Sequence, residues 1–129
     1  PSTTYNFVLR AKDGAGNVGT STNMTFTTTA TPDTTAPVIS GVTATSAAST
    51  TASIAWTTNE AATSKVYYGT TTPLLLASAL SVSDTTLLTN HSMAISGLTA
   101  STTYRFVIES KDAANNTATT TESSFVTMP

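Results

Sequence analysis

The feature that most constrains this chain is a long internal repeat. Residues 3–28 align without gaps on residues 102–127, an offset of 99 positions, and 13 of the 26 aligned pairs are identical. The second copy places Tyr104, Phe106 and Ile108 at alternate positions, with mostly polar residues between them. This period of two is typical of a half-buried β-strand. A repeat offset near 100 residues predicts whole β-sandwich domains joined in series.

The two copies differ in how much domain surrounds them. The first copy supplies only a hairpin, with a Gly-containing turn at residues 13–17. We expect residues 1–29 to be the C-terminal hairpin of a preceding repeat, in a chain that is a piece of a longer protein. Residues 30–36, which contain proline and threonine, are expected to form a stiff linker before a complete domain at residues 37–129. Because a lone hairpin is marginal in water, its apolar face needs strands from elsewhere.

The complete domain is predicted to be all-β, a seven-stranded antiparallel immunoglobulin-like sandwich. Its expected first strand, residues 37–45, places Ile39 and Val42 inward across an irregular step at Gly41. The expected later strands cover residues 50–58, 63–68, 91–96, 104–111 and 117–127, with an edge strand and a loop within residues 70–89. Short alternating strands separated by turn residues are typical of a two-sheet sandwich.

Three motifs within residues 37–127 resemble those of a fibronectin type III domain. They are Trp56 in Ile-Ala-Trp-Thr-Thr, the run Lys65-Val-Tyr-Tyr-Gly69, and Leu98 followed six residues later by Tyr104. The resemblance implies a core tryptophan and a tyrosine corner, in which the hydroxyl bonds backbone a few residues upstream. The core residues expected on this basis are Trp56, Tyr68, Leu98, Tyr104, Phe106 and Phe125.

Two further runs narrow the resemblance to one subgroup. Residues 66–69 (Val-Tyr-Tyr-Gly) and 91–95 (His-Ser-Met-Ala-Ile) look closest to fibronectin type III domains found beside secreted hydrolases. That subgroup includes the N-terminal domain of purple-acid-phosphatase-like enzymes. In those proteins the chemistry belongs to the neighbouring domain, so the resemblance implies no activity for this chain.

The composition favours a protein that works outside the cell. Charged residues make up 9% of the chain, against roughly 25% in typical soluble domains. Threonine, at 32 residues, takes their place and favours strands while keeping an exposed face hydrated. We expect a secreted or cell-surface location in a bacterium or archaeon, with a genome-wide bias to small residues as the alternative. A net charge of −2 with no basic stripe gives no support for nucleic-acid binding.

The sequence offers no recognisable catalytic set, and we expect neither an enzyme nor a cofactor. There is no cysteine and only one histidine, His91, which shares a strand face with Met93 and Ile95. We therefore expect His91 to have a structural role. One histidine cannot build a histidine-based zinc site within a chain.

Oxygen ligands for calcium are a weaker prospect. Asp13 and Asn17 occupy the hairpin turn, and Asp33 in the linker would join them if the linker folded back. The simpler interpretation is that the Asp and Asn side chains bond the backbone of the turn. Tyr67 is expected to point outward, as a cross-strand partner or as a platform for a sugar.

The leading functional hypothesis is a non-enzymatic structural module of an extracellular repeat protein: a stalk, an adhesin or a filament subunit. Its partners would be neighbouring repeats or identical subunits, and the hairpin at residues 1–29 could polymerise the chain by strand addition. One alternative is a module that binds a glycan or a cell-surface protein through loops 59–62 and 112–116. The other is an accessory domain of a secreted hydrolase.

Overall fold

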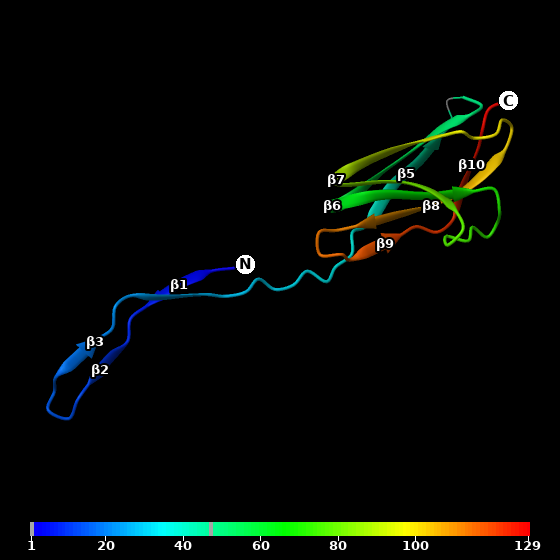
Figure 1. Cartoon of the computed structure of the whole chain (residues 1–129). Helices are drawn as coiled ribbons and strands as arrows, with labels where there is room; N and C mark the ends of the chain where they lie inside the picture. Colours follow the sequence, from blue (N-terminus) through cyan, green and yellow to red (C-terminus); the bar gives the residue numbers. More distant parts are fainter. Residues whose placement is uncertain (1, 47) are drawn as a thin grey trace. The chain divides into compact units, whose positions relative to one another are not determined.

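The computed structural model describes residues 2–46 and 48–129 of the chain (Figure 1). The chain divides into two compact units, Pro1–Pro32 and Asp33–Pro129, here called the hairpin unit and the sandwich unit. All regular structure in the described part is β-strand. Within that part, no helix has the length and hydropathy that crossing a membrane requires.

The hairpin unit is one long antiparallel hairpin with an interruption on each side. Its strands are β1 (Thr4–Phe7), β2 (Arg10–Lys12), β3 (Val18–Thr20) and β4 (Met24–Thr27). β1 pairs with β4, and β2 pairs with β3. The turn between β2 and β3 is closed by Asp13, whose carboxylate accepts hydrogen bonds from the backbone amides of Ala15 and Asn17 and from the Asn17 side chain.

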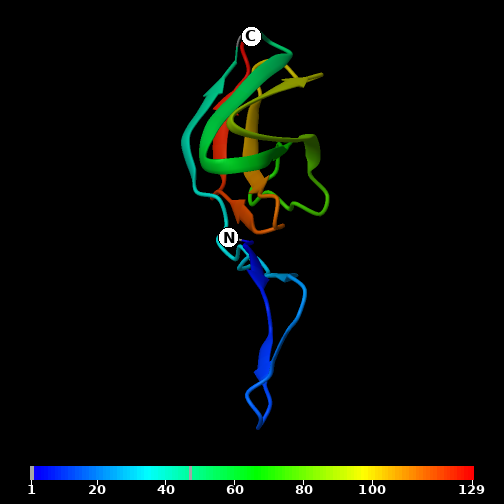
Figure 2. The same ribbon diagram turned by 90° about the vertical axis from the view of Figure 1, so that its left-hand side faces the viewer.

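The sandwich unit contains six hydrogen-bonded strands in two layers. They are β5 (Ile39–Thr45), β6 (Thr51–Gly69), β7 (Leu80–Ser96), β8 (Thr103–Lys111), β9 (Thr117–Thr119) and β10 (Ser123–Val126). The first half of β6 pairs with β5 and with the end of β7. The second half of β6 pairs with the start of β7 and with β8, which also pairs with β9 and β10. Figure 2 shows β6 as a curved ribbon that joins the two layers.

The predicted fold class is confirmed, with one correction to its strands. The strands expected at residues 50–58 and 63–68 are one continuous strand, β6, whose pairing with β7 is irregular between Thr57 and Ala62. Because the chain bends there without leaving the extended conformation, β6 serves as two of the seven strands of an immunoglobulin-like sandwich. Residues 70–79 form a loop, and β7 starts at Leu80 and extends through residues expected to be loop.

The expected inward position of Val42 is wrong. Gly41 has a φ of 62°, and the register of β5 against β6 shifts between Ser40 and Thr43. This irregularity changes which side chains face the core, as a β-bulge does. Ile39 and Ala44 pack against the core, whereas Val42 is exposed.

The core of the sandwich unit lies between its two layers. The inward positions of β6 alternate from Ala52 through Trp56 to Tyr68, as the period of two requires. The structure places all six of the expected core residues in one buried cluster, namely Trp56, Tyr68, Leu98, Tyr104, Phe106 and Phe125. The Tyr104 hydroxyl accepts a hydrogen bond from the backbone amide of Thr99 at 3.0 Å, which is the geometry of a tyrosine corner.

Candidate functional site

His91 is locked into the core of the sandwich unit. Its ring stacks on Trp56 with centroids 4.9 Å apart and planes 7° from parallel. Its two nitrogens bond hydroxyls, Nε2 with Thr58 at 2.9 Å and Nδ1 with Ser64 at 2.7 Å. Burial lowers the pKa of His91, so the ring stays neutral at physiological pH. A buried histidine with both nitrogens already bonded is suited to holding strands together.

Trp56 has its own polar partner on the opposite layer. Its indole N–H donates to the hydroxyl of Ser110 on β8 at 3.0 Å, and both residues are buried. In the described part of the chain, every buried side-chain nitrogen or oxygen has a hydrogen-bond partner. The polar atoms of the core are thus bonded to one another across and within the layers.

Three carboxylates meet at one end of the sandwich unit. Asp33, Glu60 and Asp112 each place an oxygen within 4.8 Å of the others. Asp112 is buried, Glu60 is half-buried and Asp33 is exposed. The Asn116 side chain bridges this group, because its amide donates both to the Asp112 carboxylate at 2.7 Å and to the Asp33 backbone carbonyl at 3.2 Å.

The electrostatics of this acidic group are uneven. Burial, and then the charges of Asp33 and Asp112, raise the pKa of Glu60. Burial also acts to raise the pKa of Asp112, but hydrogen bonds from Asn116 and from neighbouring backbone amides outweigh it and hold that pKa below its usual value. Carboxylate oxygens at this spacing are the ligand type that calcium takes. These three residues are accordingly those that could hold a divalent cation.

The calcium candidates from the sequence fall in different places. Asp13 and Asn17 lie in the turn of the hairpin unit, where they bond one another at 2.8 Å, and that bond is the main cause of the lowered pKa of Asp13. Asp33 belongs to the sandwich unit and accepts from the backbone amide of Thr35. Glu60 is not among those candidates. It lies in β6, in the span 59–62 that the sequence predicts to be a loop, and nothing local in the sequence pairs it with Asp33.

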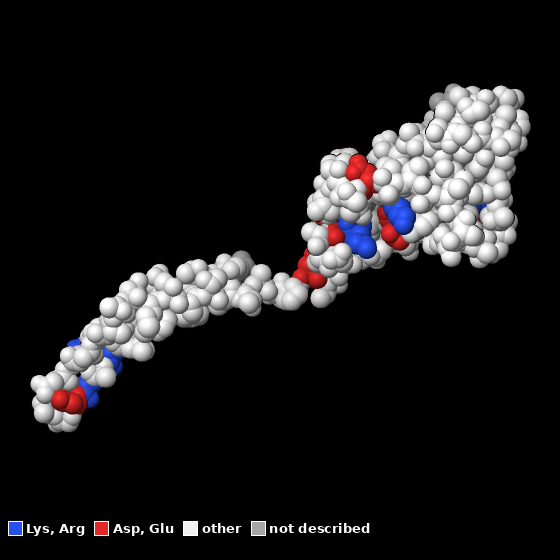
Figure 3. All heavy atoms as spheres, in the orientation of Figure 1, with Lys and Arg blue, Asp and Glu red and all other residues white. Residues whose placement is uncertain are grey.

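A second polar surface lies on the outer face of β6, β7 and β8. Lys65, Asp84, Glu109 and Lys111 line a groove of about 240 Å³ together with serine and threonine hydroxyls. The Lys65 ammonium lies 4.4 Å from the centre of the Tyr67 ring, and the Tyr67 hydroxyl donates to Glu109. In Figure 3 most of the visible charged side chains of the sandwich unit lie near one another at one end, and most of the remaining surface is white. Because Lys65 already covers a half-buried Tyr67, the ring is a poor open platform for a sugar.

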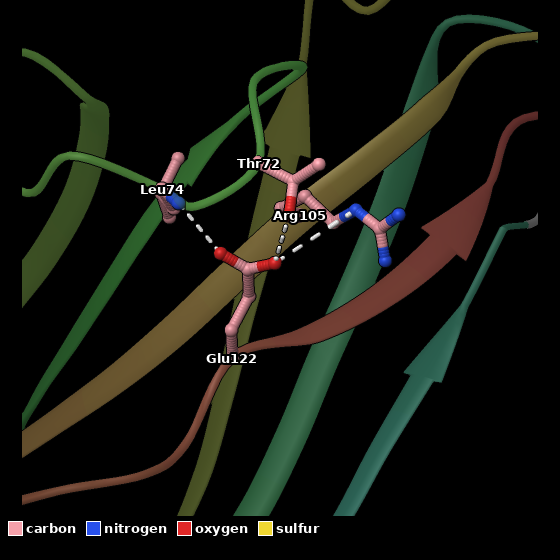
Figure 4. Close-up of polar contacts among 4 residues, drawn as sticks. All are labelled: Thr72, Leu74, Arg105 and Glu122. Atoms are coloured by element: carbon pink, nitrogen blue, oxygen red, sulfur yellow. Dashed lines mark hydrogen bonds and ion pairs between the residues drawn. The ribbon is translucent and has the colours of Figure 1, made fainter.

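Glu122 fastens the loop between β6 and β7 (Figure 4). Its carboxylate accepts from the backbone amide of Leu74 at 2.6 Å and from the Thr72 hydroxyl at 2.9 Å, and Arg105 lies 3.9 Å away. The loop covers a pocket of about 370 Å³ that is lined by Tyr68, Leu74, Leu80 and Tyr104 among others. Nothing in the sequence around residue 122 indicated this anchor, since its partners lie about 50 residues earlier.

Comparison with known proteins places the chain in a family. The family model described as "Purple acid Phosphatase, N-terminal domain" matches residues 39–127. The chain belongs to this family. The match begins with β5 and ends just after β10, so this N-terminal-domain family accounts for nearly all of the sandwich unit. The resemblance to a fibronectin type III domain is confirmed by the relatives and the solved structure described next.

Individual relatives agree with that assignment. Endoglucanase B of Cellulomonas fimi is 36% identical over all of this chain and 12% of its own length. Exoglucanase B of the same organism is 38% identical over 89% of this chain and 10% of its own length. Chitinase A1 of Niallia circulans is 39% identical over 88% of this chain and 16% of its own length. The chain thus spans only a small part of each relative.

A solved structure shows the same fold. The FN1–FN3 domains of chicken CNTN1 superpose with a TM-score of 0.57 over 100% of this chain and 44% of that one. At 18% identity, this likeness concerns the fold alone.

Proposed function

We propose that this chain is a non-catalytic module of a secreted bacterial enzyme that hydrolyses a structural polysaccharide. The observation that carries the proposal is the similarity to three polysaccharide hydrolases. This chain covers only 10–16% of the length of each. A module of this size leaves ample chain for a separate catalytic domain. Its mechanism is geometric: a rigid sandwich holds the catalytic domain at a set distance from its neighbours.

The interior of the sandwich unit supports this proposal. The Trp56 indole N–H bonds the Ser110 hydroxyl of the opposite layer, and both nitrogens of His91 bond neighbouring hydroxyls. These hydrogen bonds stabilise the packing of the two layers. A fully bonded polar core of this kind specifies one packing of the layers and is suited to a rigid element.

The test is deletion of the module from the full-length protein. Removal of residues 33–129 is expected to leave kcat on a short soluble substrate unchanged and to lower the rate on insoluble polysaccharide severalfold. The isolated chain, assayed on both a polysaccharide and a phosphate monoester, is expected to be inactive. Hydrolysis by the isolated chain, or loss of activity on the soluble substrate, would contradict a non-catalytic role.

The second candidate is a repeat module of a cell-surface stalk, adhesin or filament, favoured by the internal repeat of residues 3–28 at residues 102–127. The flanking gene sequence separates the two candidates. A glycosidase domain on either side supports the accessory role, whereas a long run of similar repeats with a surface anchor supports the stalk.

A further inference from the structure

The two repeated hairpins have the same internal architecture. In the hairpin unit Tyr5 pairs with Phe26, and in the sandwich unit Tyr104 pairs with Phe125, an offset of 99 on both strands. The outer ladder repeats in the same way, since β2 and β3 pair in the register of β8 and β9. The turns also match, because Asn116 donates to Asp112 as Asn17 does to Asp13. The hairpin unit therefore already has the conformation of one part of a sandwich.

The equivalent faces differ sharply in exposure. Tyr5 and Phe26 are 50% and 53% exposed, whereas Tyr104 and Phe125 are both 7% exposed. Leu9 is 59% exposed, and its counterpart Ile108 is fully buried. The rings of Tyr5 and Phe26 stack on each other at 5.3 Å and thus form a flat apolar surface.

In the sandwich unit this face is covered by β6. Tyr68 pairs with Phe106 and Lys65 pairs with Glu109 along the edge of β8 that faces away from β10. Trp56 covers the middle of the face and donates to Ser110. These contacts define the kind of segment that fits the equivalent face of the hairpin unit.

We propose that the apolar face of the hairpin unit is the docking surface for another β-segment. This segment has the strand arrangement of residues 37–99 but differs from them in its side chains at three places. The proposal is independent of the function proposed above. It follows from positions 10, 11 and 23 of the hairpin unit, where the residue differs from a counterpart that contacts β6 or the loop after it in the sandwich unit.

The first difference is one of charge. Position 10 is Arg, whereas its counterpart Glu109 faces Lys65 across the strand pair. A lysine opposite Arg10 would place like charges on neighbouring strands, which is destabilising. The docking segment therefore carries an acidic or neutral residue where the sandwich unit has Lys65.

The second difference concerns a buried hydrogen bond. Position 11 is Ala, whereas Ser110 accepts the indole N–H of Trp56. A tryptophan placed over Ala11 would bury a donor that has no acceptor there. The docking segment therefore carries an apolar residue without an N–H, such as Phe or Leu, where the sandwich unit has Trp56.

The third difference concerns the loop after the covering strand. Position 23 is Asn, whereas Glu122 holds the backbone of Leu74 and the hydroxyl of Thr72. A neutral, shorter amide cannot supply the same charge-assisted hydrogen bonds. The loop of the docking segment is therefore fastened differently from residues 70–79.

These differences decide between two occupants. A second copy of this chain would bring Lys65 opposite Arg10 and Trp56 over Ala11, and its own strands already cover Phe106 and Phe125. A distinct segment with matched residues has neither conflict. The occupant is thus the N-terminal part of another fibronectin type III-like repeat, and the chain does not assemble with itself through this face.

The experiment adds residues 37–99 directly ahead of Pro1 of the full chain, which restores the spacing found before residue 100. Hydrogen exchange is then measured at the amides of β1 and β4, with β6 amides of the sandwich unit as the internal folding control. Because the added segment is tethered, its high effective concentration offsets the mismatches at positions 10 and 11, and exchange in β1 and β4 is expected to slow by about tenfold or more relative to the original chain. Unchanged exchange there, with β6 intact, would overturn the docking proposal.

A matched pair of variants tests the residue assignment. Arg10→Glu with Ala11→Ser recreates the chemistry of Glu109 and Ser110, and is expected to slow exchange in the extended chain by about a further tenfold. The same two changes in the original chain are expected to have no effect. Equal protection with and without the changes in the extended chain would overturn the inference about positions 10 and 11.

Sedimentation of the original chain tests the choice of occupant. The chain is expected to remain monomeric at micromolar concentration, with β1 and β4 amides exchanging fast. A dimer in which those amides become protected would instead make a second copy the occupant and overturn this part of the proposal.

Discussion

The two hairpins show which properties of a β-strand are local and which are not. The pairing of the two strands is interrupted at the same place in both, where a side-chain hydroxyl takes the place of a backbone acceptor. In the hairpin unit Ser21 accepts the backbone amide of Leu9 at 2.8 Å, and in the sandwich unit Thr120 accepts the amide of Ile108 at 3.1 Å. Across the break the register shifts by one residue, and it does so identically in the two hairpins: Phe7 pairs with Met24 and Arg10 with Thr20, as Phe106 pairs with Ser123 and Glu109 with Thr119. Register and turn therefore follow from residues within the hairpin itself.

Burial of the same side chains depends on distant residues. Tyr104 and Phe125 stack with centroids 5.7 Å apart, and Tyr68 contacts Tyr104 from β6, some 36 positions earlier in the chain. Tyr5 stacks on Phe26 in the same way, but no third strand lies beside them: in the described residues, β1 is hydrogen-bonded to β4 alone. A shared local sequence thus gives a shared local conformation but very different contributions to stability.

The largest expected effect comes from truncating one of the two phenylalanines that occupy equivalent positions in the two hairpins. Phe125→Ala is expected to lower the free energy of unfolding of the sandwich unit by about 3–5 kcal/mol, because it empties a packed aromatic site. Phe26→Ala is expected to change that free energy by less than about 0.5 kcal/mol, because Phe26 is exposed. Urea titration followed by the fluorescence of Trp56 measures both. Similar losses in the two variants would show that Phe26 is buried by something in solution.

The next effect tests the buried bond between the layers. Ser110→Ala is expected to cost about 1–3 kcal/mol, since it leaves the Trp56 indole N–H buried without an acceptor. Ala11→Ser, the reverse change at the matching position, is expected to stay within about 0.5 kcal/mol because residue 11 is exposed. Denaturant titration with near-ultraviolet circular dichroism at the tryptophan band would follow both variants. If Ser110→Ala left the free energy of unfolding unchanged, water or another group would have to accept the hydrogen bond from the Trp56 indole.

Much of the fold could be predicted because its signals are local. Alternation identified the inward face of β6 from Ala52 to Tyr68, and the spacing of Leu98 from Tyr104 identified the tyrosine corner. The continuity of β6 through residues 58–62 could not be predicted, because an extended bend and a loop share the same polar composition. Val42 was misplaced because the irregularity at Gly41 shifts the alternation.

The acidic group and the loop anchor could not be predicted for a different reason. Asp33, Glu60 and Asp112 come from three separate segments, and only the bent path of β6 brings Glu60 to the other two. Glu122 likewise meets Thr72 and Leu74 across 50 residues. Tertiary contacts of this kind leave no periodic trace in a single sequence.

Glu122 offers a third, local test of the comparison, because the matching residue in the hairpin unit is Asn23. Glu122→Asn is expected to speed exchange at the Leu74 amide by about tenfold and to leave the exchange of β6 unchanged. The hydrogen bond from that amide, followed by that from Thr72, lowers the pKa of Glu122.

The lowered pKa gives this contact a definite pH dependence. A carboxylate whose folded pKa is below its unfolded value stabilises the fold above the unfolded value, and this stabilisation is lost as the pH falls through the folded pKa. Protection of Leu74 in the wild type should therefore fall in acid, relative to Glu122→Asn. Exchange followed by NMR over a pH series would check this, and parallel pH profiles in the two proteins would exclude Glu122 as the anchor.

The smallest expected effect concerns Glu60, which has no acidic counterpart in the hairpin unit. Because burial and the neighbouring charges of Asp33 and Asp112 raise its pKa, Glu60 binds its proton more tightly in the folded state than in the unfolded state. Ionised Glu60 then costs stability above its folded pKa, and the cost disappears as the pH falls below its unfolded value. Glu60→Gln is expected to raise the Tm by about 1–3 °C at neutral pH and by nothing in acid.

Added calcium sharpens this last prediction, because a cation held by the three carboxylates would remove their repulsion. If the three carboxylates do not bind calcium, Glu60→Gln melts at a higher temperature than the wild type both with calcium and with chelator. If the group holds calcium, the wild type gains Tm with the metal and overtakes Glu60→Gln, which has lost one ligand. Asp13→Asn in the hairpin unit is the matched control, since its carboxylate bonds Asn17 and its own turn. A thermal scan of the three proteins at neutral pH, with calcium and with chelator, distinguishes repulsion from ligation, and a Glu60→Gln variant that melts below the wild type in chelator would contradict both.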